Sequence, residues 1–207
     1  MIQTRLGISG GSPLHCTIYR GGVKAYDIST SSRPKSTTSI IRDGKLISSI
    51  EWSTISRTKS KITIEGHTGV LGRTLLRAGK LTRSRIYKTT SGKTLKWKIN
   101  GSGLSCTSPD TGFNLAYHNG IAINAFSRNA SMLDIFDEGL DIQDAIVATW
   151  VTMEVIVRGR NPTSSFGNML GEGAWGGGGD SNVGGGSLVG GDGGGDGGGD
   201  GGGGGGE

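Results

Sequence analysis

The stretch LDIQDAIVATWVTMEVIVRGR, residues 140–160, decides the fold. Its apolar residues fall on every side of a helical wheel, and a helix that is apolar all round must be surrounded by protein or lipid. Asp141 is the predicted N-cap, and Asp144 takes the place of the acidic partner in a capping box. The uninterrupted apolar core, residues 145–153, is nine residues long, whereas a membrane span needs about 20. We therefore predict a buried helix over about residues 141–158.

The chain before this helix has the pattern of short β-strands separated by turns. Gly21-Gly22 and Asp43-Gly44 each lie between two β-rich runs, which indicates two hairpins. Strands that recur roughly every 8–12 residues favour a sandwich or barrel, and one apolar helix after them suggests a helix threaded through a closed barrel. Residues 72–81 fit either a short helical turn or a loop. The predicted strands are residues 15–20, 23–28, 37–42, 45–53, 60–65, 83–89, 94–100, 103–107, 113–118, 121–126 and 131–136, and the predicted core includes Trp52, Trp97, Ile146, Trp150 and Val151.

Composition divides the chain into a folded body and a tail. Glycine accounts for 24 of the 47 residues in 161–207, and such a segment buries too little apolar surface to offset its conformational entropy. We expect a flexible N-terminus over residues 1–11, a folded domain over 12–160 and a disordered, acidic tail over 161–207. The N-terminus has no apolar run of signal-peptide length, so we expect an intracellular, cytoplasmic protein.

The positive charge is concentrated in the body. Residues 1–160 contain all 22 Lys and Arg but only 11 of the 17 acids. If the strands 83–89 and 94–100 pair, four cations converge on one outer patch suited to phosphate oxygens. The predicted anionic-ligand patch consists of Arg83, Arg85, Lys96 and Lys98. The alternative is a charged exterior that serves solubility alone.

No catalytic or metal-binding constellation can be assembled from the sequence. Cys16 and Cys106 are isolated, as are the three histidines. The glycines of residues 66–72 lack the Gly-Lys-Ser/Thr ending of a phosphate-binding loop. The acids before the helix do not have calcium-ligand spacing, and capping is the expected role of Asp134, Asp137, Glu138, Asp141 and Asp144. We expect no cofactor, no metal and no enzyme activity.

Several short motifs occur in an order that resembles a known family. They are Ile50-Glu51-Trp52, Arg85-Ile86-Tyr87, Leu95-Lys96-Trp97-Lys98, Leu133-Asp134-Ile135-Phe136, and Ile146-Val147-Ala148-Thr149 followed by Glu154 and Arg158. Over about residues 12–160 the chain resembles an uncharacterised fungal domain family related to the tubby-like, LURP-one-related and phospholipid-scramblase-like barrels. The resemblance implies a closed, roughly twelve-stranded antiparallel barrel around a hydrophobic C-terminal helix.

The resemblance also implies a class of ligand. Tubby-like relatives bind phosphoinositides, but no residue here can be matched to their site. Scramblase-like proteins carry a cysteine cluster and a membrane-inserting segment, which this chain lacks, so we do not expect scramblase activity. Our leading expectation is a binding module that associates peripherally with anionic phospholipid. A structural or protein-interaction domain is the alternative, and nucleic-acid binding through the basic body comes third because the interleaved aromatics of single-strand binders are missing.

Overall fold

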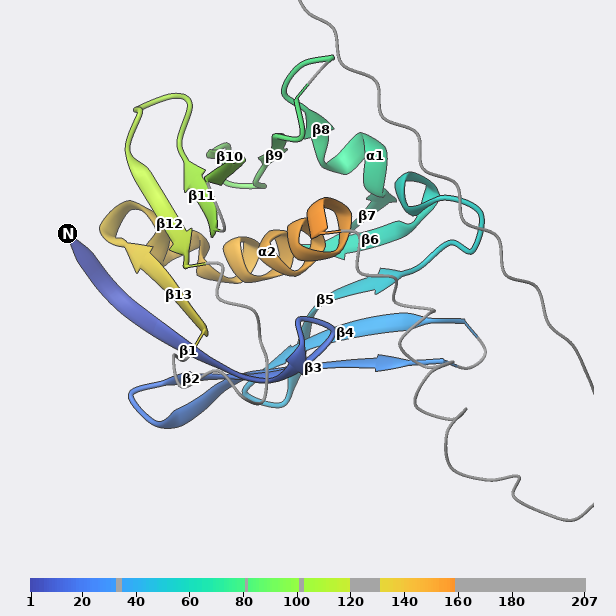
Figure 1. Ribbon diagram of the computed structural model, residues 1–207, viewed down its shortest axis with the longest axis horizontal. Helices are drawn as coiled ribbons and strands as arrows, with labels where there is room; N and C mark the ends of the chain where they lie inside the picture. The colour runs from blue at the N-terminus through green and yellow to red at the C-terminus, as the bar shows by residue number, and fades with distance from the viewer. Residues whose placement is uncertain (33–34, 81, 101–102, 120–130, 159–207) are drawn as a thin grey trace, which may run out of the picture. The chain divides into compact units, whose positions relative to one another are not determined.

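Helix α2, Gln143–Arg158, lies at the centre of the strands in the computed structural model (Figure 1). Trp150 and Ile146 are fully buried, as expected for a helix that is apolar on all sides. Trp97 donates a hydrogen bond from Nε1 to Thr149 Oγ1 over 2.9 Å, which ties the sheet to the helix. The predicted buried C-terminal helix and the mainly β class are confirmed. The five predicted core residues Trp52, Trp97, Ile146, Trp150 and Val151 are at most 4% exposed.

The structure describes residues 1–32, 35–80, 82–100, 103–119 and 131–158. All of them lie in one compact unit, Met1–Gly173. The predicted strand 121–126 and the predicted tail 161–207 lie outside the described residues. No helix within these described ranges is long and apolar enough to span a membrane.

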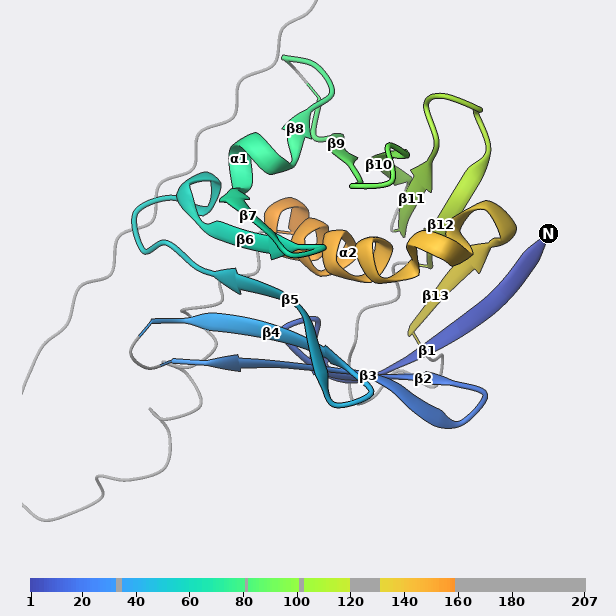
Figure 2. The same cartoon turned by 180° about the vertical axis from the view of Figure 1, so that it is seen from behind.

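The strands form one antiparallel sheet. Its order is β7-β6-β5-β4-β3-β2-β1-β13-β12-β11-β10-β9-β8, and Figures 1 and 2 show β1–β5 on one side of α2 and β9–β12 on the other. The strands are β1 (Ile2–Ser12), β2 (His15–Arg20), β3 (Val23–Ser31), β4 (Thr37–Arg42), β5 (Lys45–Glu51), β6 (Lys61–Ile64), β7 (His67–Val70), β8 (Leu76–Arg77), β9 (Arg85–Lys88), β10 (Thr94–Asn100), β11 (Gly103–Thr107), β12 (Asn114–His118) and β13 (Ser131–Phe136).

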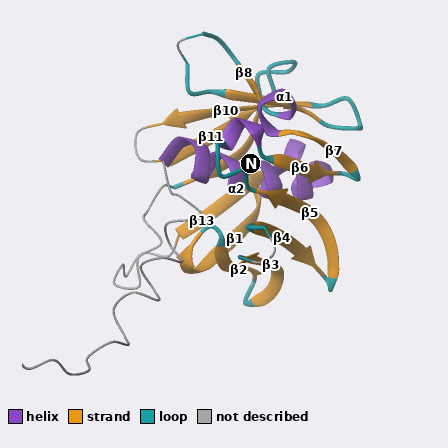
Figure 3. Cartoon of the chain, turned by 90° about the vertical axis from the view of Figure 1, so that its right-hand side faces the viewer, coloured by secondary structure: helices purple, strands orange, loops and turns teal. Residues whose placement is uncertain are grey.

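The predicted closure of the barrel is wrong. The 13-stranded sheet ends at β7 and β8, which do not pair with each other among the described residues. The short helix α1, Leu71–Thr74, connects these two strands along the chain, and Figure 3 shows it beside β8. Because β8 pairs with only two residues of β9, the rest of the β9 edge faces a gap. This gap between β7 and β9 is called the seam below.

The N-terminus is a strand, contrary to the flexible segment expected over residues 1–11. Strand β1 pairs with both β2 and β13, and Leu6 lies opposite Leu133. Leu6 and Ile8 alternate inward and are 0% and 6% exposed, as the two-residue period of a strand requires. One of the two partner strands, β13, lies more than 120 residues away in sequence, so this part of the pairing could not be predicted from local signals.

Three hairpins turn on a residue pair with positive φ, and one of them is the predicted Gly21-Gly22 turn between β2 and β3, with φ of 56° and 83°. Asp43 and Gly44 have φ of 50° and 73°, and Glu65 and Gly66 have φ of 51° and 77°. These are the values of a type I′ turn, whose twist matches that of the flanking strands. The Asp43-Gly44 turn is also the one predicted. The Glu65-Gly66 turn lacks a favourable first residue, yet it places the Glu65 side chain at the seam.

The start of the helix differs from the prediction. A 3₁₀ turn, η2 (Asp137–Ile142), precedes α2, and its N-cap is Phe136 rather than Asp141. Gly139 in this turn has no room for a side chain, because a Cβ would lie 2.5 Å from the Leu115 carbonyl oxygen. The Asp141 carboxylate instead lies 2.8 Å from Lys93 Nζ.

Candidate functional site at the seam

The four predicted patch residues do not share one surface. Strands β9 and β10 pair so that Arg85 lies opposite Trp97 and Ile86 opposite Lys96. Arg85 is therefore on the inner face and is 6% exposed, which corrects the prediction of a four-cation patch. A hydrogen bond from Thr89 N to Lys93 O closes the hairpin and sets this register.

The outer face of this hairpin carries a different group of cations. Residues on one face of a strand alternate with those on the other, so Lys88 shares the outer face with Lys96 and Lys98. Arg83 is exposed but precedes β9. Of the four predicted residues, only Lys96 and Lys98 therefore share a face. Lys88 lies on that face with them in place of Arg85, and Arg83 lies outside the sheet.

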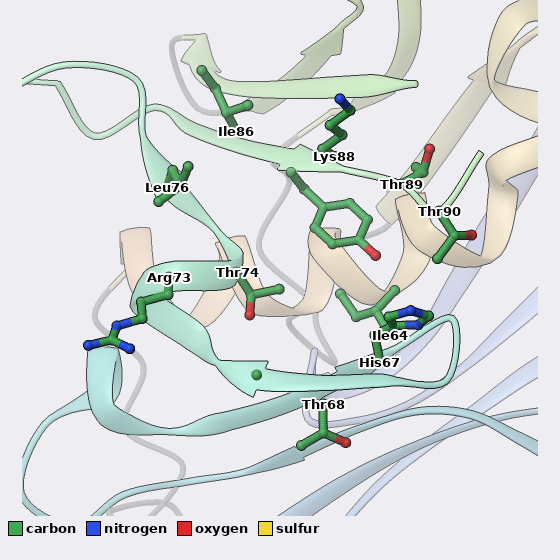
Figure 4. A pocket seen from close by; sticks show the side chains of 12 residues that line it. Ile64, His67, Thr68, Arg73, Thr74, Leu76, Ile86, Lys88, Thr89 and Thr90 are labelled. Carbon is green, nitrogen blue, oxygen red and sulfur yellow. The ribbon is translucent and has the colours of Figure 1, made fainter. Parts of the chain in front are cut away.

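A cavity of about 450 Å³ occupies the seam (Figure 4). Strand β7 forms one side and β9 the other, while α1 and β8 form one end. The volume falls within the range of about 300–1,000 Å³ that is usual for small-ligand pockets. Its lining consists of Ile64, His67, Thr68, Gly69, Arg73, Thr74, Leu76, Ile86, Tyr87, Lys88, Thr89 and Thr90.

Glu65 holds the other end of the seam together. Its Oε2 accepts a 2.8 Å hydrogen bond from Tyr87 OH and a 2.9 Å hydrogen bond from Thr90 N. Burial raises the pKa of Tyr87, and the hydrogen bond to Glu65 and its negative charge raise it further, so the phenol stays a donor. Glu65 is the only acid between residues 57 and 98. Through these two hydrogen bonds it connects the β6–β7 hairpin to the β9–β10 hairpin.

Backbone groups also face the seam. In an antiparallel ladder, residues whose N–H and C=O groups bond to the partner strand alternate with residues whose groups point away from it. The two-residue turn makes Ile64 and His67 a bonded pair, so the N–H and C=O of Thr68 point away from β6. By the same rule, the bond between Thr89 and Lys93 directs the N–H and C=O of Lys88 away from β10. The seam therefore offers backbone donors and acceptors as well as hydroxyl groups.

The rim of the cavity combines positive charge with exposed apolar side chains. Arg73 and Lys88 are exposed, and neither forms a salt bridge with a residue that the structure describes. Leu76, which lines the cavity, is 54% exposed, and Val70, the last residue of β7, is 39% exposed. Figure 4 shows the ends of the Arg73 and Lys88 side chains directed away from Ile64 and His67. Such a rim can bind an anionic group while its apolar side chains contact an apolar phase.

A second group of polar residues, which the sequence did not reveal, lies inside the core. His118 Nδ1 is 3.0 Å from Glu154 Oε1, and His118 Nε2 is 2.8 Å from Ser131 Oγ. The order of the three groups is that of a hydrolytic triad. All three side chains are at most 4% exposed, however, and none of them lines the seam cavity. We therefore assign this group to the stability of the core.

The acidic residues near the helix are used in ion pairs. Asp134 lies 2.7 Å from Arg5 Nε, and Asp144 lies 2.9 Å from Arg42 Nη1. Within the described parts of the chain, no group of three or more His, Cys, Asp or Glu residues could hold a metal ion. Burial raises the pKa of the Cys16 thiol to about 12, with a further contribution from Asp27, so that thiol is a poor nucleophile or metal ligand near neutral pH.

Comparison with known proteins places the chain in a family. Searches of curated proteins and of solved structures gave no match. A family model, described as a family of unknown function (DUF6593), matches residues 11–159. The match covers the strands from β2 to β13 and the central helix. This chain therefore belongs to the DUF6593 family of unknown function.

Proposed function

We propose that this protein is a non-enzymatic binding module that associates with the cytoplasmic surface of membranes containing anionic phospholipid. The seam cavity takes the phosphorylated head group, and Arg73 and Lys88 pair with its phosphate oxygens. The exposed side chains of Leu76 and Val70 contact the interface between head groups and acyl chains. A tubby-like relationship is part of the same proposal, and the arrangement of antiparallel strands around a hydrophobic C-terminal helix supports it.

The residues at the rim of the cavity are the main support for this proposal. Arg73, Lys88 and the exposed Leu76 line one cavity, the two cations have no carboxylate partner among the described residues, and the exposed Val70 directly precedes α1. Peripheral membrane segments combine basic and apolar side chains in this way. An anionic surface attracts a nearby Lys or Arg by about 1 kcal/mol each, so Arg73 and Lys88 together contribute about 2 kcal/mol. Lys96 and Lys98, on the outer face of β10, add to the attraction over a longer distance.

Vesicle flotation tests this proposal. The full chain is mixed with phosphatidylcholine vesicles that contain or lack a phosphatidylinositol phosphate. We expect binding only to the anionic vesicles, and at least about 30-fold weaker binding by Arg73→Glu/Lys88→Glu, which corresponds to the loss of about 2 kcal/mol. A soluble inositol phosphate, added as a competitor, separates recognition of the head group from recognition of the membrane surface.

The control variant is Lys24→Glu/Lys35→Glu. It changes the net charge by the same amount, but its residues lie near the ends of β3, on the far side of α2 from α1 and β8 (Figure 1). We expect it to retain most of the binding. Equal binding to neutral vesicles, or an equal loss in both double variants, would exclude the seam as the site.

A further inference from the structure

Strands β8 and β9 place two arginines directly opposite each other. Arg77 pairs in register with Arg85, and like charges that face each other across strands are destabilising. Arg85 is also 6% exposed. Its Nη1 donates a long hydrogen bond of 3.4 Å to the Ser84 carbonyl oxygen, and no carboxylate in the described part of the chain forms an ion pair with either arginine. Arg77 is exposed to solvent, so the cost falls on the buried Arg85 unless another group supplies negative charge.

A cavity of about 320 Å³ lies beside this pair, and both arginines line it. It is separate from the seam cavity, because successive residues of the connecting segment face opposite ways. Leu75 and Arg77 line the cavity described here, whereas Thr74 and Leu76 line the seam. The remaining lining residues are Thr58, Leu71, Gly72 and Ile156, so the cavity lies beside the C-terminal part of α2.

The electrostatics of the cavity favour an anion. Burial lowers the pKa of Arg85, and the charge of Arg77 lowers it further, yet a guanidinium stays protonated in proteins. Near the end of α2, the Val155 carbonyl oxygen accepts its 3.1 Å hydrogen bond from Arg57 Nη1 and not from Arg85. A buried cation with no anionic partner is expensive, and two adjacent guanidinium groups match the oxygens of a phosphate.

We infer that the Arg77–Arg85 cavity is a binding site for a phosphate-sized oxyanion, either inorganic phosphate or the phosphate group of a small soluble monoester. The anion lies between the two guanidinium groups and accepts hydrogen bonds from both. It offsets their mutual repulsion and stabilises the contact between β8 and β9. The site is independent of membrane binding, which uses Arg73 and Lys88 on the other side of the α1–β8 segment.

Thermal unfolding of the full chain tests this inference. Inorganic phosphate and glycerol 3-phosphate are each compared with chloride at the same ionic strength. We expect phosphate to raise Tm in a saturable way, by about 5–10 °C at a concentration 100 times Kd. Stabilisation by glycerol 3-phosphate as well would show that the site accepts a monoester, and stabilisation by phosphate alone would restrict the ligand to the free ion.

Variants locate the effect. Arg85→Met removes the buried charge, so its Tm in chloride should exceed that of the parent and should not respond to phosphate. Arg85→Lys keeps the charge without the forked donors, and its affinity for phosphate should fall at least about tenfold. Arg73→Met, in the seam, should keep the full response. The inference is overturned if the parent responds equally to phosphate and chloride, or if Arg85→Met retains the phosphate effect.

Discussion

Removing one partner of the buried His118–Glu154 pair should destabilise the protein severely. Both side chains are at most 1% exposed, and their nearest polar atoms are 3.0 Å apart. Glu154→Leu leaves His118 Nδ1 without this carboxylate, and His118→Leu leaves the carboxylate in the core without the imidazole. Breaking a buried pair in this way costs about 3–5 kcal/mol. Domains of this size have a free energy of unfolding of about 5–15 kcal/mol, so either variant loses a large share of its stability.

A double-mutant cycle separates the pair from the volume change. His118→Leu/Glu154→Leu removes both polar groups together, so the double variant should lose less stability than the two single variants added together. We expect this difference, the coupling energy, to be at least about 1 kcal/mol. Glu154→Gln keeps the shape and an acceptor oxygen, and we expect a smaller cost of about 1–3 kcal/mol. Arg5→Ala breaks the exposed contact with Asp134, and it should leave the denaturation midpoint nearly unchanged.

Urea denaturation followed by tryptophan fluorescence measures these free energies. Trp150 is a suitable probe because its ring meets that of His118 edge-on, with centroids 5.2 Å apart. If both single variants cost less than about 1 kcal/mol, or if the costs of the singles simply add in the double variant, the two groups do not stabilise each other and the reasoning fails.

Two further predictions concern the core. Trp150 is fully buried against the sheet, so Trp150→Asp should abolish the cooperative thermal transition, because the lost packing alone costs about 3–5 kcal/mol and a buried carboxylate adds to it. Leu140→Asp, at a position that is 40% exposed, should unfold normally, and a cooperative transition in Trp150→Asp would contradict the central position of the helix. Burial and Asp27 raise the pKa of Cys16 from 9.0 to about 12. Between these two pH values only the thiol of the unfolded chain ionises. The contribution of Cys16 to stability is therefore complete below pH about 9 and is lost as the pH rises toward 12. Cys16→Ala should therefore flatten the decline of Tm between pH about 9 and 11, and an unchanged slope would remove Cys16 as a cause.

The sequence by itself determined the elements whose signals are local. The apolar periodicity of residues 143–158 is complete within the segment, so the helix could be predicted from its own residues. The same holds for the Asp43-Gly44 hairpin, whose turn requires positive φ at both residues, and for the strands β10, β11 and β13, whose bounds agree with the predicted ones. Trp52, Trp97 and Trp150 were recognisable as core residues because large apolar side chains in such elements are rarely left in water.

Only the tertiary structure decided which distant residues meet. A strand's alternation tells which of its residues share a face, but a register shift of one residue exchanges the two faces. The Thr89–Lys93 hairpin closure sets that register, and it places Arg85 inside opposite Trp97 instead of outside with Lys96. Long-range pairing likewise turned the N-terminal residues into a strand, and the connection through α1 left the seam open. The Glu65–Tyr87 and His118–Glu154 contacts join residues 22 and 36 positions apart, and no local pattern encodes such contacts because they arise only when the sheet curves around the helix.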